Sequence, residues 1–251
     1  MNLQSRFWVL IFFFISGATG LVYEVVWTRL LTRVMGNTHY SIATVLTIFM
    51  AGLALGSYLG GRWIDRRKNP LFFYAVLEAA IGLYCLLVPS LIESASPLFE
   101  WVYQTQTESY SKASLYRFFI CGVILLIPTS LMGATLPVLS KYVSNNRMFV
   151  GRDVGTLYSL NTFGAVFGAL SSAFIFMRVW GVLATIWFAA ALNIGIAVTI
   201  YLFFRSDVIA TSKEESGQKN RAMESPLLGT NTIFILLAFG FSGWCALTYQ
   251  V

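Results

Sequence analysis

Two acidic residues fall inside long apolar stretches of this sequence, and they are its strongest candidates for chemistry. Glu24 lies in the apolar stretch 7–27, and Glu78 lies in the stretch 71–91. An ionised carboxylate near the middle of a bilayer costs roughly 2.5–3.5 kcal/mol, so acids are retained there where they face water, a partner or a cation. Both carboxyls are therefore predicted to serve a binding site or a specific helix contact.

Counting residues along each helix predicts how deep these side chains lie. At 1.5 Å per residue, Glu24 lies about 25 Å from the start of its span, close to the outer boundary, and Glu78 lies about 10 Å into its span, in the cytoplasmic half. Asn161 reaches nearly the depth of Glu78 from the same side, which predicts a contact or near contact between the two side chains. Asn193 lies deeper, near the middle of the sixth span.

These positions support two alternatives. In the functional one, Glu24 is an outer site for a cation or a proton, and Glu78 with Asn161 forms an inner gate. In the structural one, Glu24 is exposed at the interface and Glu78 makes a hydrogen bond between helices. Arg29 lies about 140° around the helix from Glu24, so the partner of Glu24 must come from another helix, from solvent or from a substrate.

The composition requires a membrane. Of the residues, 57% are hydrophobic and 11% are charged, whereas ordinary globular chains carry about 25% charged residues. Spans of about 20 apolar residues match the roughly 30 Å hydrocarbon layer, and no strand-like alternation suggests a barrel. We therefore predict an all-α polytopic bundle in contact with the lipid bilayer. The expected spans are residues 7–27, 40–61, 71–91, 114–137, 156–179, 183–204 and 229–251.

The basic residues set the orientation. The net charge is +6, and 12 of the 17 Lys and Arg residues fall on one side of the predicted spans. Cytoplasmic loops carry this excess, so the amino terminus is predicted to be cytoplasmic in a multi-pass protein of the cell (inner) membrane. The positive charge is explained by topology, and we expect no nucleic-acid partner.

Metal and cofactor chemistry is not indicated. Cys85, Cys121 and Cys245 lie singly inside predicted spans, without paired spacing and without a neighbouring histidine. Disulfide and zinc interpretations both fail on that spacing. The one histidine in the sequence, His39, borders the second span and is interpreted as interfacial. No cofactor is expected.

The chain also repeats its beginning near its end. Residues 233–251 match residues 7–25 at seven of nineteen positions. We therefore expect a six-helix membrane unit over residues 1–204, a cytoplasmic linker over 205–228, and over 229–251 the first helix of a second, incomplete repeat. Repeated six-helix units are typical of transporters.

Glycines and prolines predict how the helices pack. Glycines at every fourth position of the second span, and a pair in the fifth, indicate flat stripes for close helix contact. They are Gly52, Gly56, Gly60, Gly164 and Gly168. Two prolines in the fourth span predict a kink, with nearby hydroxyls satisfying the freed carbonyls. The aromatic-rich outer segment 92–113 is either a short interfacial helix or a loop with aromatic anchors.

Several separate motifs carry a family resemblance. The segments FFISGATGLVYEVVWTRLL, IFMAGLALGSYLGGRWIDR, PLFFYAVLEAAIGLY, LLIPTSLMGATLPVLS and GTLYSLNTFGAVFGA together resemble the membrane part of the spermidine-synthase-like membrane proteins. In that family a major-facilitator-like region is fused to a spermidine synthase domain. The resemblance covers residues 12–204 and implies a major-facilitator-like half, with polyamines as the related chemistry.

The resemblance does not by itself make this chain an enzyme. A spermidine synthase domain needs a glycine-rich loop after a strand and acidic residues for the amines, and the sequence shows neither, so enzyme activity stays open. We expect a module that binds or transports a small cationic solute through Glu24, Tyr23, Glu78 and Asn161. The alternative is a membrane anchor or assembly subunit for a partner protein or an aminopropyltransferase domain. Further helices or a partner subunit are expected in either case.

Overall fold

The computed structural model describes residues 3–35, 38–65, 67, 69–105, 110–143, 150–203 and 240–243. The chain divides into two compact units, Met1–Lys213 and Glu214–Val251. In the second unit the described residues 240–243 are helical. The predicted linker 205–228 and most of the predicted seventh span 229–251 lie outside the described residues, so both remain predictions.

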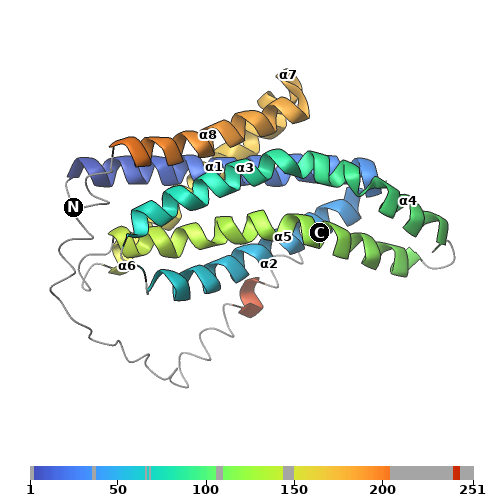
Figure 1. Ribbon diagram of the computed structural model, residues 1–251, viewed down its shortest axis with the longest axis horizontal. Helices are drawn as coiled ribbons and strands as arrows, with labels where there is room; N and C mark the ends of the chain where they lie inside the picture. Colours follow the sequence, from blue (N-terminus) through green and yellow to red (C-terminus); the bar gives the residue numbers. More distant parts are fainter. Residues whose placement is uncertain are drawn as a thin grey trace. The chain divides into compact units, whose positions relative to one another are not determined.

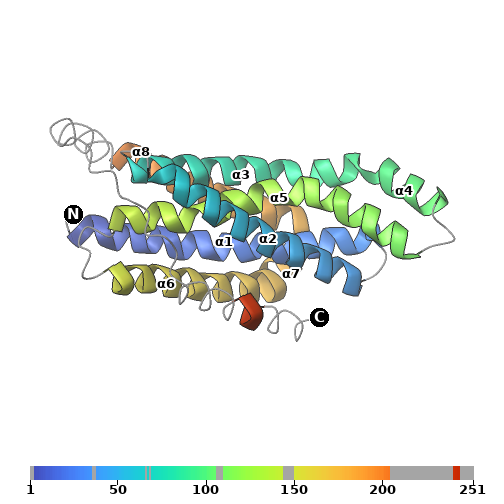
Figure 2. The same cartoon turned by 90° about the horizontal axis from the view of Figure 1, so that it is seen from below.

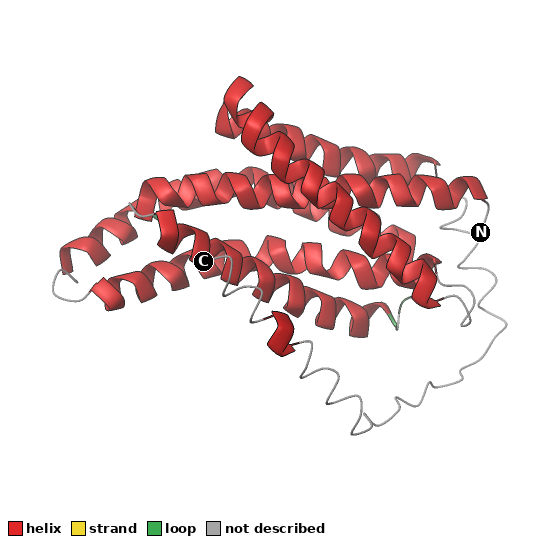
Figure 3. Ribbon diagram, turned by 180° about the vertical axis from the view of Figure 1, so that it is seen from behind, coloured by secondary structure: helices red, strands yellow, loops and turns green. Residues whose placement is uncertain are grey.

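The first unit is helical wherever it is described, apart from short connections (Figure 3). Six of its helical segments are long and apolar enough to cross a membrane, which confirms the predicted all-α polytopic bundle. The elements are α1 (Leu3–Met35), α2 (Thr38–Ile64), α3 (Pro70–Ser94), α4 (Ser96–Thr105), α5 (Tyr110–Val143), α6 (Val150–Ser171), a π-helical turn η2 (Ser172–Phe176), α7 (Met177–Val179) and α8 (Gly181–Phe203).

Two short connections join successive helices without a long loop. After α3, Ala95 keeps a right-handed helical conformation, and α4 follows at once (Figure 1), so part of the outer segment is a helix. Gly181 joins α7 to α8 with a φ of 80°. That left-handed conformation is open to glycine at little cost, because glycine has no Cβ. Gly181 thus lies at the turn between the fifth and the sixth spans.

The spans pack in preferred pairs. The most extensive packing joins α2 to α5, α1 to α6, and α3 to both α8 and α5, while α1 also contacts α8. Figure 2 shows α3 and α8 together on one side of the bundle, α6 on the opposite side, and α1 and α5 between them. α1 therefore separates the helix that carries Asn161 from the helix that carries Glu78.

The predicted glycine stripes are confirmed as packing surfaces. On α2, each of the three glycines of the stripe is so close to α5 that a Cβ there would overlap the neighbouring helix. The contacts are Gly52 with Thr129, Gly56 with Ser130, and Gly60 with Ala134. On α6, Gly164 lies against Phe14 and Gly168 against Ala18 of α1. Small residues let backbones approach in this way, and the resulting dispersion contacts hold membrane helices together.

We expect Gly56→Ala to destabilise the bundle measurably. The added methyl group would meet the backbone of Ser130, which has no flexible end to move away. Overpacking of this kind typically costs about 1–3 kcal/mol. Thermal unfolding of the detergent-solubilised protein measures the effect. Gly122→Ala is the matched control, because its Cβ would lie 4.0 Å from the nearest atom of Ile48. Equal unfolding midpoints for both variants would contradict close packing between Gly56 of α2 and Ser130 of α5.

A carbonyl freed by proline is satisfied from another helix. Pro128 lies inside α5 and has no amide N–H to donate to Ile124, four residues earlier. The hydroxyl of Tyr84 on α3 donates to that carbonyl oxygen at 3.1 Å. Thr129, one of the hydroxyls expected to do this, donates instead to Leu125 at 2.7 Å. The proline thus creates a polar contact between α3 and α5.

Candidate functional site

Glu78 is hydrogen-bonded to an asparagine, but not to the one that the sequence indicated. Asn193 of α8 donates its Nδ2 to Glu78 Oε2 at 2.7 Å. Both side chains are buried, with 0% and 1% exposed. The predicted contact between Glu78 and Asn161 is wrong, since Asn193 occupies that place.

The error lies in the lateral arrangement of the helices. Asn161 lies against Gly17 on α1, and α6 packs mainly on α1, whereas α3 packs on α8 and α5. Residue counting gives the depth of a side chain but not the neighbour of its helix. The amide that eases the burial of Glu78 therefore comes from a different span.

Tyr23 joins the same group through Asn193. Its hydroxyl donates to Asn193 Oδ1 at 3.4 Å, and its ring stacks on Trp27 with centroids 5.6 Å apart. With Oδ1 accepting from Tyr23, the amide nitrogen of Asn193 is directed at the carboxyl. Tyr23 and Glu78, both predicted site residues, are thus brought together, and Asn193 is the linking residue that the sequence analysis did not select.

Two further hydroxyls surround the carboxyl. Those of Tyr74 and Ser16 face Glu78, but Glu78 Oε1 and the Tyr74 hydroxyl are both buried without a hydrogen-bond partner. Tyr74 lies one helical turn before Glu78, a spacing that places both on one face of α3. We call Ser16, Tyr23, Tyr74, Glu78 and Asn193 the buried polar cluster. Within the described residues, no Lys or Arg forms an ion pair with Glu78.

Glu24 lies on another face of α1. Its side chain is half-buried, and in the described part of the chain no hydrogen bond or ion pair to its carboxyl is found. Glu24 follows Gly17 by seven residues, which places the two on one face of the helix about 10 Å apart. Since Gly17 contacts Asn161, the four predicted site residues form two groups. Asn161 lies where α6 meets α1 and Glu24 lies farther along that face of α1 by helical spacing, whereas Tyr23 and Glu78 lie between α1, α3 and α8.

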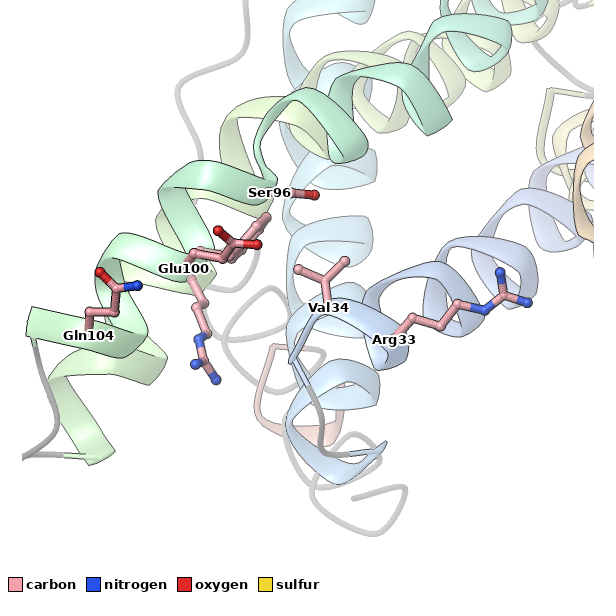
Figure 4. A pocket seen from close by; sticks show the side chains of 7 residues that line it. Arg33, Val34, Ser96, Glu100 and Gln104 are labelled. Atoms are coloured by element: carbon pink, nitrogen blue, oxygen red, sulfur yellow. The ribbon is translucent and has the colours of Figure 1, made fainter.

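A pocket of about 470 Å³ lies at the carboxyl-terminal end of α1. Its walls come from the end of α1, from α4 and from α5, and none of the predicted site residues lines it. The lining residues are Arg33, Val34, Ser96, Phe99, Glu100, Gln104 and Arg117. Figure 4 shows that the guanidinium of Arg33 points away from Glu100 and Gln104. The pocket thus presents mixed charges without a convergent set of groups.

The fold and the polar groups define a multi-pass helical membrane protein with acidic side chains inside its spans. No protein-family model and no solved structure matches the chain. Three curated relatives do. Polyamine aminopropyltransferase 1 of Streptomyces coelicolor is 24% identical over 204 residues, and polyamine aminopropyltransferase 2 of that organism is 26% identical over 206 residues. Polyamine aminopropyltransferase of Oceanobacillus iheyensis is 18% identical over 189 residues.

These matches confirm the resemblance to spermidine-synthase-related membrane proteins. The matched residues cover 75–80% of this chain but 34–35% of each relative. The chain therefore spans about a third of the length of the relatives that it matches. Over that length it is similar to polyamine aminopropyltransferases.

Proposed function

We propose that this module binds a small cationic solute of the polyamine class, as a step in its recognition or transport across the membrane. The observation that carries the proposal is the carboxyl of Glu24, which lies inside a membrane span without a partner among the described residues. An acid in such a position serves an ion or substrate pathway more often than it serves packing. The solute class comes from the names of the relatives.

The chemistry of the α1–α6 face fits such a solute. Polyamines carry protonated amines at neutral pH, and a carboxylate attracts a cation more strongly in a partly buried setting than at an aqueous surface. Asn161 supplies an amide oxygen about 10 Å along the same face. A chain of several amines separated by methylene groups can therefore contact a carboxylate at one end and an amide at the other.

The direction of the module in the membrane is part of the proposal. Arg6 near the start of α1, Arg62 near the end of α2 and Lys141 near the end of α5 share one end of the bundle, because successive spans run in opposite directions. Cytoplasmic ends carry such a basic excess. The amino terminus is then cytoplasmic, in a cell (inner) membrane, and Glu24 lies toward the outer side.

A second candidate is a membrane anchor or assembly subunit for an aminopropyltransferase domain. It is favoured by the share of the relatives that the chain matches, since about two thirds of their length lies outside the match. The tight glycine seams, which suit a rigid scaffold, also favour it. In that role the polar groups serve contacts between helices or with a partner, and the module has no solute of its own.

We expect Glu24→Gln to weaken polyamine binding about 10- to 100-fold. A charged hydrogen bond contributes about 1.5–3 kcal/mol, and each 1.4 kcal/mol changes Kd tenfold. The measurement is calorimetric titration of the purified protein in lipid nanodiscs with putrescine and spermidine.

Glu93→Gln is the matched control, because it removes the same charge from an exposed position at the end of α3. Unchanged affinity in the control and loss of affinity in the Glu24 variant support solute binding. Equal affinity in all three proteins would rule out a charge role for Glu24. An absence of binding to the unaltered protein would favour the anchor.

A further inference from the structure

The contacts of two helix pairs are equivalent, residue by residue. A position in α1 corresponds to the position 116 residues later in α5, and a position in α2 corresponds to the position 108 residues later in α6. Three contacts between α1 and α6 then recur between α5 and α2. Gly17 meets Asn161 as Gly133 meets Leu53, Gly164 meets Phe14 as Gly56 meets Ser130, and Gly168 meets Ala18 as Gly60 meets Ala134.

Local sequence and hydrogen bonding follow the same correspondence. Gly17–Ala18–Thr19 recurs as Gly133–Ala134–Thr135. Each threonine donates its hydroxyl to the carbonyl three residues earlier, Thr19 to Ser16 at 2.9 Å and Thr135 to Met132 at 2.6 Å. The remaining two spans, α3 and α8, are equivalent to each other. Gly82 of α3 contacts Ala190 of α8, and these two positions are themselves 108 residues apart.

Several residues of the two apolar cores also exchange under this correspondence. One core contains Val22, Trp27, Val88, Ile92 and Leu125, and the other contains their equivalents Val138, Val143, Ile196, Ile200 and Val9. The six spans are therefore two three-helix repeats, α1–α3 and α5–α8. Three crossings bring the chain to the opposite side of the membrane, so the second repeat is inverted relative to the first.

The buried polar cluster breaks this equivalence. Every member has an equivalent without a carboxyl, amide or hydroxyl group. Ser16 corresponds to Met132, Tyr23 to Leu139, Tyr74 to Val182, Glu78 to Ile186, and Asn193 to Cys85. Ile186, Leu139 and Cys85 are as deeply buried as the polar residues that they match. The same places in the fold are thus filled by apolar side chains or a thiol in the other repeat, just as Val45 fills the place of the buried Asp153.

We infer that the buried polar cluster is a binding site for a primary ammonium group, and not part of what holds the bundle together. A primary ammonium has three N–H donors. The cluster offers three oxygens that face one another, Glu78 Oε1 and the hydroxyls of Tyr74 and Ser16, and two of them are buried without a partner. The ligand class rests on the proposed function. The location rests on the two buried oxygens without a partner.

The site is occluded in this structure. Glu78 is fully buried between α1, α3 and α8. The titratable groups that face it are Tyr23 from α1, and Tyr74 and Cys85 from α3 itself. The described part of α8 contributes the neutral amide of Asn193. An amine therefore reaches the carboxyl when α8 moves away from α3, and Gly82 is a point where the two helices pack closely.

The test is to replace the polar pair by its equivalents in the other repeat, Glu78→Ile with Asn193→Cys. We expect the combined variant to unfold at the same temperature as the unaltered protein, or at a higher one. We expect it to lose the rise in unfolding temperature that putrescine gives the unaltered protein in nanodiscs. Thr185→Val is the control, because it removes a buried hydroxyl of α8 that bonds within its own helix, and it should keep the putrescine effect.

Each outcome decides the inference. A lower unfolding temperature for the combined variant would show that the cluster is structural and would overturn the inference. An unchanged putrescine effect in a stable combined variant would also overturn it, as would the absence of any putrescine effect on the unaltered protein. A putrescine effect that Glu24→Gln leaves unchanged and the combined variant abolishes supports this site and rejects the role proposed for Glu24.

Discussion

Asn193→Leu by itself is expected to destabilise the protein, whereas Glu78→Ile with Asn193→Cys is not. The single substitution removes the Nδ2 donor that lies 2.7 Å from Glu78 Oε2, and Oε1 already lacks a partner. Removing one hydrogen-bond partner of a buried polar group costs about 1–3 kcal/mol of stability, and more if the group is ionised.

The two variants differ in whether they leave a buried polar group without its partner. Removing one partner of a buried hydrogen-bonded pair leaves the other unsatisfied, but replacing both by apolar groups of similar shape can be nearly neutral or stabilising. Thermal unfolding followed by tryptophan fluorescence compares the single and combined variants in one detergent. An unfolding midpoint of Asn193→Leu equal to that of the unaltered protein would show that the amide does not support the carboxyl.

Properties that depend on one helix at a time were predictable from the sequence. Long apolar stretches located six spans, because span length follows from the thickness of the bilayer. The glycine spacing on α2 and α6 identified the packing faces, because residues four apart lie on one side of a helix. Neither inference requires knowing which helices are neighbours.

Properties that depend on which helices meet were not predictable in the same way. The depth of Glu78 suggested an amide partner, but choosing between Asn161 and Asn193 requires the order of the helices around α1. The carbonyl freed by Pro128 is satisfied by Tyr84, forty residues away on another helix. Such contacts are set by the packing of the whole bundle, which a single sequence does not encode in any local pattern.

The inverted repeat was hidden for a related reason. Outside the Gly–Ala–Thr segment and the glycine spacing, most equivalent positions share burial and apolar character but not residue identity. In a membrane span apolar residues replace one another easily, so the two repeats keep equivalent contacts although most of their residues are not identical. Positions where the two repeats differ in chemistry, the polar cluster among them, are consequently visible only after the contacts have been aligned.

Asp153→Asn is expected to destabilise the end of the bundle where α1 and α6 begin. Asp153 is 5% exposed, and Arg6 donates a hydrogen bond to its carboxylate. Charge-assisted hydrogen bonds of this kind contribute about 1.5–3 kcal/mol, and the lower end applies because the Arg6 side chain is 32% exposed. The effect should change little with added salt, since a carboxylate this buried is poorly screened.

A double-mutant cycle with Arg6→Gln isolates the pair. If the ion pair itself holds the two helices, the combined variant will be less destabilised than the sum of the single variants. Arg152→Gln is the control, because its Nε lies 4.0 Å from the same carboxylate on a side chain that is 67% exposed, and exposed pairs contribute at most about 1 kcal/mol. Additive losses at Arg6 and Asp153 would show that each side chain acts alone, and α1 would then be held to α6 by the seam at Gly164 and Gly168.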